Sequence, residues 1–257
     1  MTQLLSIVRS ASVLAAVWML LPVNPAWSAP AGAESQQFNV TFDDAYKVGD
    51  VFDPAKSKQN TLVAKPGNAF PLTKLTGLTN ELNGKKGNWT ATVASGAPFD
   101  SNFLRFDVPA GEMLAGRMEI FRAQEKRQKG TWYFSFDYAR LTEGKGGPEV
   151  CEIQVKTGNG GIAYAPAMWY GVFLGDWRNA KSNRDLGVGK VNQIRAEVDF
   201  DTATYRLFVN GEKTEEGKCT GGDFGGLSFV FMNKIADHDV SFGVDNLRTG
   251  SMITGPL

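Results

Sequence analysis

Three carboxylates alternate along one short segment, a spacing that could place two acidic groups on one face. Glu197, Asp199 and Asp201 occupy every second position of Glu197-Val-Asp-Phe-Asp201, and alternate residues of a strand share a face. Two carboxylates flanking a cleft can hydrolyse a glycosidic bond. However, Gln193 and Arg195 continue the same polar series, and a polar row opposite an apolar row is typical of a hydrated strand face. We therefore expect a solvated outer face here and predict no hydrolase motif.

The single histidine offers the other place for acid–base chemistry. His238 lies in Asp237-His-Asp239, between two expected strands. Histidine titrates near neutral pH and often acts as a general base. A tight, hydrated turn explains this short sequence more simply than a catalytic site does.

An aromatic and polar segment offers binding chemistry instead. Residues 164–179 hold four Tyr or Trp residues, and charged and amide side chains flank the last tryptophan. Aromatic rings can pack on the C–H faces of sugars, and sugar hydroxyls need polar partners. The segment therefore predicts a saccharide contact made by Trp169, Tyr170, Asp176, Trp177, Arg178 and Asn179. The alternative is that these aromatics are ordinary core or rim residues.

Composition and the first residues limit the partners. The chain has 257 residues, with 27 basic and 27 acidic side chains, and this balance argues against a nucleic-acid surface. Residues 1–29 contain one charge, at Arg9, an apolar run over 13–23, and small residues before position 30. This pattern predicts a secretory signal peptide, because the apolar run is too short to span a bilayer. We expect a secreted or periplasmic protein with no membrane partner after cleavage; an uncleaved anchor is the alternative.

The remaining residues, 30–257, predict a single all-β domain. Apolar and polar residues alternate along several segments, which is the signal of a half-buried strand. Asn210-Gly211 predicts a two-residue hairpin turn, and Met113–Lys126 is the one weak helix candidate. The alternating segments are 132–138, 149–156, 194–200, 205–209, 227–232 and 240–247.

Three segments resemble strands of the concanavalin A-like lectin/glucanase superfamily, which includes laminin-G-like jelly rolls. Residues 191–211 resemble the late hairpin of these domains, and residues 130–136 resemble an inner strand. Residues 244–249 resemble the last strand, which returns beside the first strand, here residues 38–42. The resemblance implies a concanavalin A-like β-sandwich of two antiparallel sheets.

The resemblance also implies where ligands would bind. The concave sheet is the usual binding face, and Glu152 and Gln154 would line it if Ile153 and Val155 face the core. The return of the last strand beside the first would bring Asp245 close to Asp43 and Asp44, whose oxygens suit a structural calcium ion. The alternative is that these are turn and edge carboxylates, because no compact calcium-binding loop is present.

The two cysteines predict a disulfide only if the chain is exported. Cys151 and Cys219 would then meet an oxidising compartment. The alternative is that Cys151 is a small apolar residue of its strand.

Three functions follow from these patterns. The first is a carbohydrate-binding, lectin-like domain that recognises a poly- or oligosaccharide and requires no cofactor. The second is a polysaccharide-degrading enzyme, a hydrolase or lyase, on the same fold. The third is a structural surface or matrix protein without a small ligand.

Overall fold

The computed structural model describes residues 33–43, 46–52, 77–79, 81–122, 130–142, 149–169, 172–176 and 184–253. In these ranges the chain forms strands and no helix. Accordingly, the described part contains no helix long and apolar enough to cross a membrane. The weak helix prediction over Met113–Lys126 is wrong for its described part, because Met113–Arg122 is a strand paired with Phe224–Ile235.

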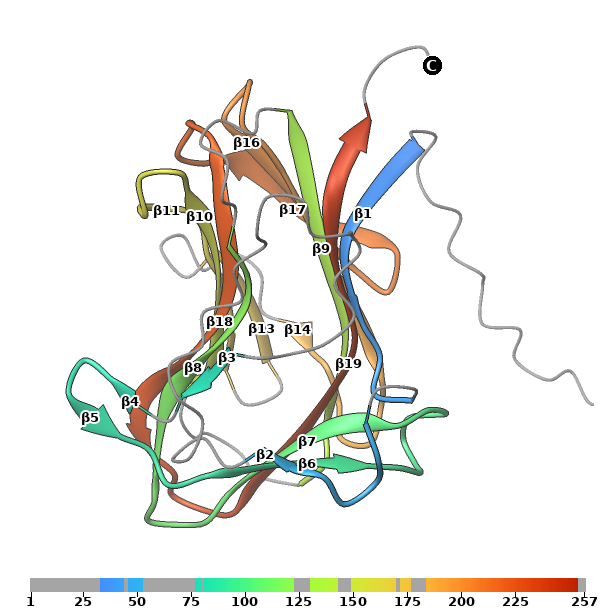
Figure 1. The fold of residues 1–257 in the computed structure, drawn as a ribbon, viewed down its shortest axis with the longest axis vertical. Helices are drawn as coiled ribbons and strands as arrows, with labels where there is room; N and C mark the ends of the chain where they lie inside the picture. Colours follow the sequence, from blue (N-terminus) through green and yellow to red (C-terminus); the bar gives the residue numbers. More distant parts are fainter. Residues whose placement is uncertain are drawn as a thin grey trace, which may run out of the picture. The chain divides into compact units, whose positions relative to one another are not determined.

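The described strands form two antiparallel sheets, one of nine strands and one of eight. The two sheets lie as separate layers in Figure 1. The nine-stranded sheet has the order β17 (Glu212–Lys218), β16 (Thr204–Val209), β15 (Asn192–Asp199), β9 (Thr131–Arg140), β19 (Val240–Ile253), β7 (Phe103–Val108), β6 (Thr90–Ala94) and β2 (Val51–Phe52). Its ninth strand, β1 (Ala33–Val40), pairs with β19.

The eight-stranded sheet has the order β14 (Arg184–Asp185), β13 (Val172–Asp176), β12 (Pro166–Trp169), β10 (Glu149–Thr157), β18 (Phe224–Ile235), β8 (Met113–Arg122) and β3 (Gly77–Thr79), with β11 (Ile162–Tyr164) also paired to β10. A separate small hairpin joins β4 (Glu81–Leu82) to β5 (Lys85–Lys86).

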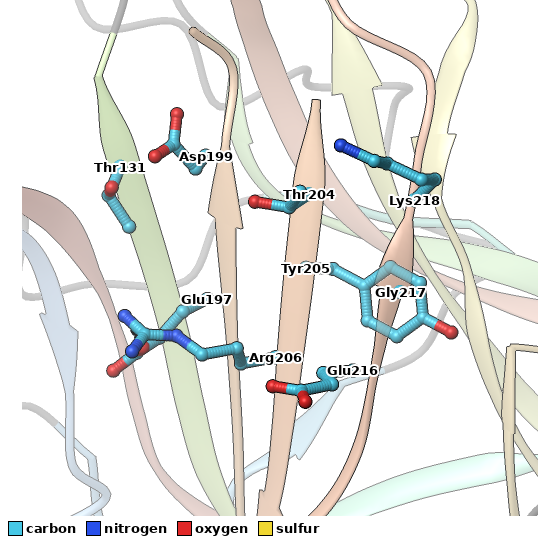
Figure 2. Close-up of a pocket in the computed structure, with 9 residues that line it drawn as sticks. All are labelled: Thr131, Glu197, Asp199, Thr204, Tyr205, Arg206, Glu216, Gly217 and Lys218. Carbon is cyan, nitrogen blue, oxygen red and sulfur yellow. Dashed lines mark ion pairs between the residues drawn. The ribbon is translucent and has the colours of Figure 1, made fainter. Parts of the chain in front are cut away.

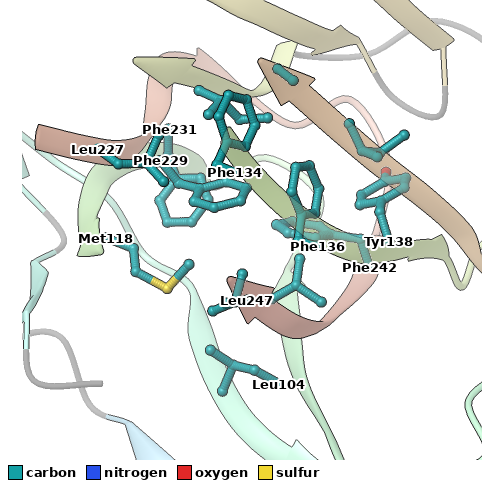
Figure 3. Close-up of a cluster of buried hydrophobic side chains, with 14 of the residues drawn as sticks. Leu104, Met118, Phe134, Phe136, Tyr138, Leu227, Phe229, Phe231, Phe242 and Leu247 are labelled. Atoms are coloured by element: carbon teal, nitrogen blue, oxygen red, sulfur yellow. The ribbon is translucent and has the colours of Figure 1, made fainter. Parts of the chain in front are cut away.

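The core lies between the two sheets and is rich in aromatic rings (Figure 3). Trp132 of β9 stacks on Phe224 of β18 with ring centroids 4.1 Å apart, and Phe136 meets Phe229 edge-on at 4.9 Å. Each of these rings is at most 4% exposed, and burying such a side chain contributes roughly 1.5–3 kcal/mol. The alternation in 132–138 therefore fixes which face of β9 is internal.

The pairings confirm the predicted β-sandwich. Phe38 lies opposite Thr249 and Val40 opposite Leu247, so the last strand does return beside the first. Asn210 and Gly211 have φ values of 53° and 78°, as a tight hairpin turn between β16 and β17 requires. The chain therefore forms a β-sandwich of two antiparallel sheets, the architecture that the resemblance to jelly rolls implies.

Candidate functional site

The orientation of β10 decides whether the predicted saccharide-contacting residues are outside the core. Ile153 and Val155 belong to the core, so Glu152 and Gln154 lie on the outer face of the eight-stranded sheet. Gln154 Nε2 donates to Glu152 Oε1 at 3.4 Å. Glu152 is only 4% exposed while Gln154 is half-buried. The carboxylate therefore orients the amide, and the amide is the more accessible group.

Backbone pairing brings the aromatic segment beside this pair. Glu152 lies opposite Ala167, and Glu149 lies opposite Trp169, so β12 is the direct neighbour of β10. Asp176 lies opposite Pro166, which adds β13 as the next strand. Only the backbone of Trp169 and Asp176 is described. Tyr170, Trp177, Arg178 and Asn179 lie outside the described residues, so their contacts with saccharide remain predictions.

Ser228 is a further polar residue of this face and was not among the predicted site residues. It lies opposite Gln154 in the pairing of β18 with β10. It is fully buried, and its Oγ has no hydrogen-bond partner among the described residues. Its position could have been predicted from the sequence, because Ser228 lies between the apolar Leu227 and Phe229 and the alternation along a strand places its side chain away from the core.

A second cluster of polar groups lies at the other sheet, where β19 meets β9. Asp245 lies opposite Asp137. Ser101 Oγ donates to Asp245 Oδ2 at 2.6 Å, and Asn246 Nδ2 donates to Asp137 Oδ2 at 2.8 Å. The other oxygen, Asp245 Oδ1, is buried with no hydrogen-bond partner in the described part of the chain. Asp43 lies near enough to act electrostatically on Asp245.

The loop between β6 and β7 places Ser101 beside Asp245, because a pair of aromatic side chains packs the loop against the sheet. Phe99 and Phe103 stack with centroids 4.4 Å apart, next to Gly243 of β19. A Cβ at Gly243 would lie 2.6 Å from the Phe99 ring and 2.7 Å from the Phe103 ring. Glycine is therefore required for the loop to pack here.

Burial and crowded negative charge perturb these carboxyl groups. Burial raises the pKa of Asp245 to about 6; the hydrogen bonds from the Ser101 side chain and the backbone amide of Asn246 oppose the shift, while Asp137 and Asp43 add to it. Burial also raises the pKa of Asp137, against the opposing effects of Asn246 and Arg248. The cluster therefore favours either a bound proton or a cation.

The fit of this cluster to calcium is partial. The described residues contain no group of three Asp, Glu, His or Cys side chains that could hold a metal ion. Asp245 and Asp137 offer carboxylate oxygens, and Asp245 Oδ1, which has no hydrogen-bond partner in the part of the chain that the structure describes, suits a hard cation. Asp44, the other predicted ligand, lies outside the described residues.

The expectation of a solvated outer face on β15 is wrong for two of its residues. Arg195 is 3% exposed and Glu197 is 1% exposed, although both lie on the outer side of the nine-stranded sheet. Arg195 Nε lies 3.0 Å from Glu197 Oε1, and its guanidinium lies 4.4 Å from the centre of the Tyr133 ring. The buried charges tolerate this position because each has an opposite charge or an aromatic face beside it. Asp201 is exposed, as expected.

The remaining predicted residues stay apart from these clusters. His238 lies in the turn between β18 and β19 and pairs through Nδ1 with the exposed Asp237, consistent with a hydrated turn. Cys219 is half-buried after β17, and the amide of Thr220 bonds to the carbonyl of Ala163. Only the backbone of Cys151 is described, opposite Met168, so the disulfide stays a prediction.

No protein-family model matches the chain, and no curated protein sequence matches it. Solved structures similar to it include a sialidase, with 14% identity over 64% of this chain and a TM-score of 0.45. An alginate lyase of polysaccharide lyase family 7 has 13% identity over 63% of this chain and a TM-score of 0.43. A cellulose-induced protein has 13% identity over 66% of this chain and a TM-score of 0.44. The chain spans 17%, 82% and 89% of these three proteins, respectively.

Proposed function

We propose that this chain is a secreted or periplasmic saccharide-binding protein that holds a poly- or oligosaccharide on the outer face of its eight-stranded sheet. The adjacency of β10, β12 and β13 carries the proposal. It places the backbone of Trp169 on the strand next to Glu152 and Gln154, and the backbone of Asp176 one strand further along the sheet.

The polar groups of this face match the chemistry of sugar hydroxyls. A hydroxyl both donates and accepts, and so does an amide such as Gln154. Glu152 fixes the amide through the 3.4 Å hydrogen bond, so Glu152 is a positioning residue. Trp169 and Trp177 would supply the aromatic surface, with Asp176, Arg178 and Asn179 at its rim. Pockets of this kind combine a few placed polar groups with aromatic walls.

A panel of soluble polysaccharides tests the proposal through two readouts on the same sample. Retardation in affinity gels measures binding, and the release of reducing or unsaturated ends measures cleavage. Gln154→Ala should weaken retention roughly fivefold, because one hydrogen bond contributes about 1 kcal/mol. Gln193→Ala is the matched control, because Gln193 is a half-buried glutamine on β15 of the other sheet. Release of ends would favour the enzyme instead, and absence of retention with every polysaccharide would contradict saccharide binding.

We also propose that a calcium ion supports the fold where β1, β9 and β19 meet. Asp245 Oδ1, which is buried without a hydrogen-bond partner among the described residues, supports this, because a buried anionic oxygen needs a cation or a proton. Asp245 and Asp137 would bind the ion, and Asp44 is the further ligand that the sequence predicts. Bound calcium would neutralise the crowded carboxylates and hold the first strand against the last.

A further inference from the structure

The nine-stranded sheet carries a groove on its outer face, away from Glu152 and Gln154. Its volume is about 540 Å³, within the range of roughly 300–1,000 Å³ that small-ligand sites occupy. Figure 2 shows side chains from four neighbouring strands, β9, β15, β16 and β17, around it. The lining residues are Thr131, Glu197, Asp199, Thr204, Tyr205, Arg206, Glu216, Gly217 and Lys218.

Two cross-strand rows form the groove. One row runs Thr131, Asp199, Thr204, Lys218, each opposite the next on the neighbouring strand. The adjacent row runs Glu197, Arg206, Glu216 in the same order. Residues directly opposite on a sheet lie within side-chain reach of each other, so the strand registers alone bring these groups together.

The two inner carboxylates are fixed acceptors. Glu197 is held by Arg195 Nε at 3.0 Å and by Arg206 Nη2 at 2.7 Å. Asp199 Oδ1 accepts from the amides of Asp201 at 2.9 Å and Thr202 at 3.0 Å. Partial burial would raise the pKa of Asp199, but these amides and the hydroxyls of Thr202 and Thr131 together lower it. The Asp199 carboxyl therefore stays ionised, and both side chains are held in place before a ligand arrives.

The outer groups of the groove are donors and one further acceptor. The Arg206 side chain is 50% exposed, and Lys218 is exposed beside Thr204. Glu216 is exposed and pairs with Lys213 at 2.7 Å. The lining thus has three carboxylates and two cations, with Arg195 as a third cation beside Glu197. An anionic ligand would meet Asp199 and Glu216, and a cationic ligand would meet Arg206 and Lys218.

A neutral ligand with many hydroxyls satisfies both kinds of group, because each hydroxyl donates to a carboxylate and accepts from Arg206 or Lys218. We infer that this groove is a second binding site, for a neutral polyhydroxylated ligand such as a short neutral oligosaccharide. The proposed function places a first saccharide site at Glu152 and Gln154, on the eight-stranded sheet. With the groove, the chain would have two sites on opposite faces. Such a chain would cross-link a long polysaccharide.

Nuclear magnetic resonance separates the two sites in one sample. The ¹⁵N-labelled mature chain is titrated with neutral cello-, xylo- and mannohexaose and with an acidic alginate hexasaccharide. We expect a neutral hexasaccharide to shift the amides of Thr204, Gly217 and Lys218, and the acidic one to shift them less. Shifts at Glu152 and Gln154 report the other face independently.

Two conservative variants test the groove chemistry. Thr204→Val removes a hydroxyl but keeps the side-chain shape, and Lys218→Ala removes an exposed donor. Each should weaken binding at the groove amides about fivefold, as loss of one hydrogen bond predicts. Thr214→Val on β17 and Lys190→Ala, both outside the lining, should leave the groove affinity unchanged.

Each outcome decides between the sites. Shifts confined to β10 and β12 would overturn the groove site and leave the proposed function standing. Shifts confined to the groove would support this inference and overturn the other face. Absence of shifts with all four probes at millimolar concentration would overturn both, and groove shifts unaffected by Thr204→Val and Lys218→Ala would overturn the assigned chemistry.

Discussion

Replacing Asp245 by asparagine should stabilise the chain when calcium is absent. In the folded state the Asp245 carboxyl is 1% exposed and has a pKa of about 6, against an ordinary value of 3.8. Asparagine removes the charge, and its amide can still accept from Ser101 and can donate to Asp137. The substitution therefore removes an unfavourable buried charge at little cost in hydrogen bonds.

The magnitude follows from the pKa. Each unit corresponds to about 1.4 kcal/mol, so the shift of Asp245 sets an upper limit of about 3 kcal/mol. Solvent near the exposed Asp43 screens part of this electrostatic penalty. The free energy of unfolding should therefore rise by about 1–2 kcal/mol. A domain of this size gains roughly 2–4 °C in Tm for each kcal/mol.

The stabilisation by Asp245→Asn depends on pH. Below pH 3.8 the carboxyl is protonated in both the folded and the unfolded states, so its contribution to stability is fully present. Between pH 3.8 and about 6 the folded state keeps a proton that the unfolded state has lost, and stability falls as the pH rises. Asp245→Asn should therefore raise Tm at pH 8 in EDTA and change it little below pH 4.

With calcium bound, the natural chain should become more stable than Asp245→Asn. Saturation at about 100-fold above the Kd adds roughly 2.7 kcal/mol to a protein that binds only when folded. The natural chain should gain this stability and Asp245→Asn should not. Asp107→Asn is the control, since Asp107 pairs with Arg105 at 2.9 Å and its substitution should not raise Tm. Thermal unfolding by circular dichroism measures all three proteins; an Asp245→Asn protein that is less stable than the natural chain at pH 8 in EDTA would refute the reasoning.

Three further predictions concern stability and covalent state. Glu197→Ala should cost about 3–5 kcal/mol, because it leaves the buried Arg195 without its carboxylate; a denaturant midpoint close to that of the natural chain would show that the pair is unimportant. Gly243→Ala should cost about 1–3 kcal/mol, because its Cβ would overlap the Phe99 and Phe103 rings. Gly158→Ala, whose Cβ has only an ordinary contact at 3.6 Å, should be nearly neutral in the same measurement. Thiol titration of the chain, expressed with residues 1–29 and denatured without reductant, should detect no thiol if Cys151 and Cys219 form a disulfide; two thiols would exclude that bond.

Sequence patterns were sufficient for the strands whose signals are local. The alternation in 132–138 and 194–200 depends on nearest neighbours, and the Asn210-Gly211 turn depends on two backbone angles. The segment 113–122 misled because Gly116 breaks its alternation, and its strand conformation depends on pairing with β18. That pairing joins residues about a hundred positions apart, which no local pattern encodes.

The functional groups were harder to predict because they depend on cross-strand rows. Glu197 looked solvated beside Gln193 and Arg195, yet the neighbouring strands bury it between Tyr133 and Arg206. The approach of Asp245 to Asp43 followed from the expected return of the last strand. Asp137 was not anticipated, because its position opposite Asp245 requires the register of β9 with β19.

The most direct test of saccharide binding pairs affinity with stability in Trp177→Ala. If Trp177 is a binding platform, its loss should weaken retention of the bound polysaccharide by about 1–3 kcal/mol and leave Tm unchanged. If Trp177 is a core residue, the substitution should cost about 3–5 kcal/mol of stability. Reduced retention at constant Tm is the predicted result; a large fall in Tm with unchanged retention by the folded fraction would contradict saccharide binding at this face.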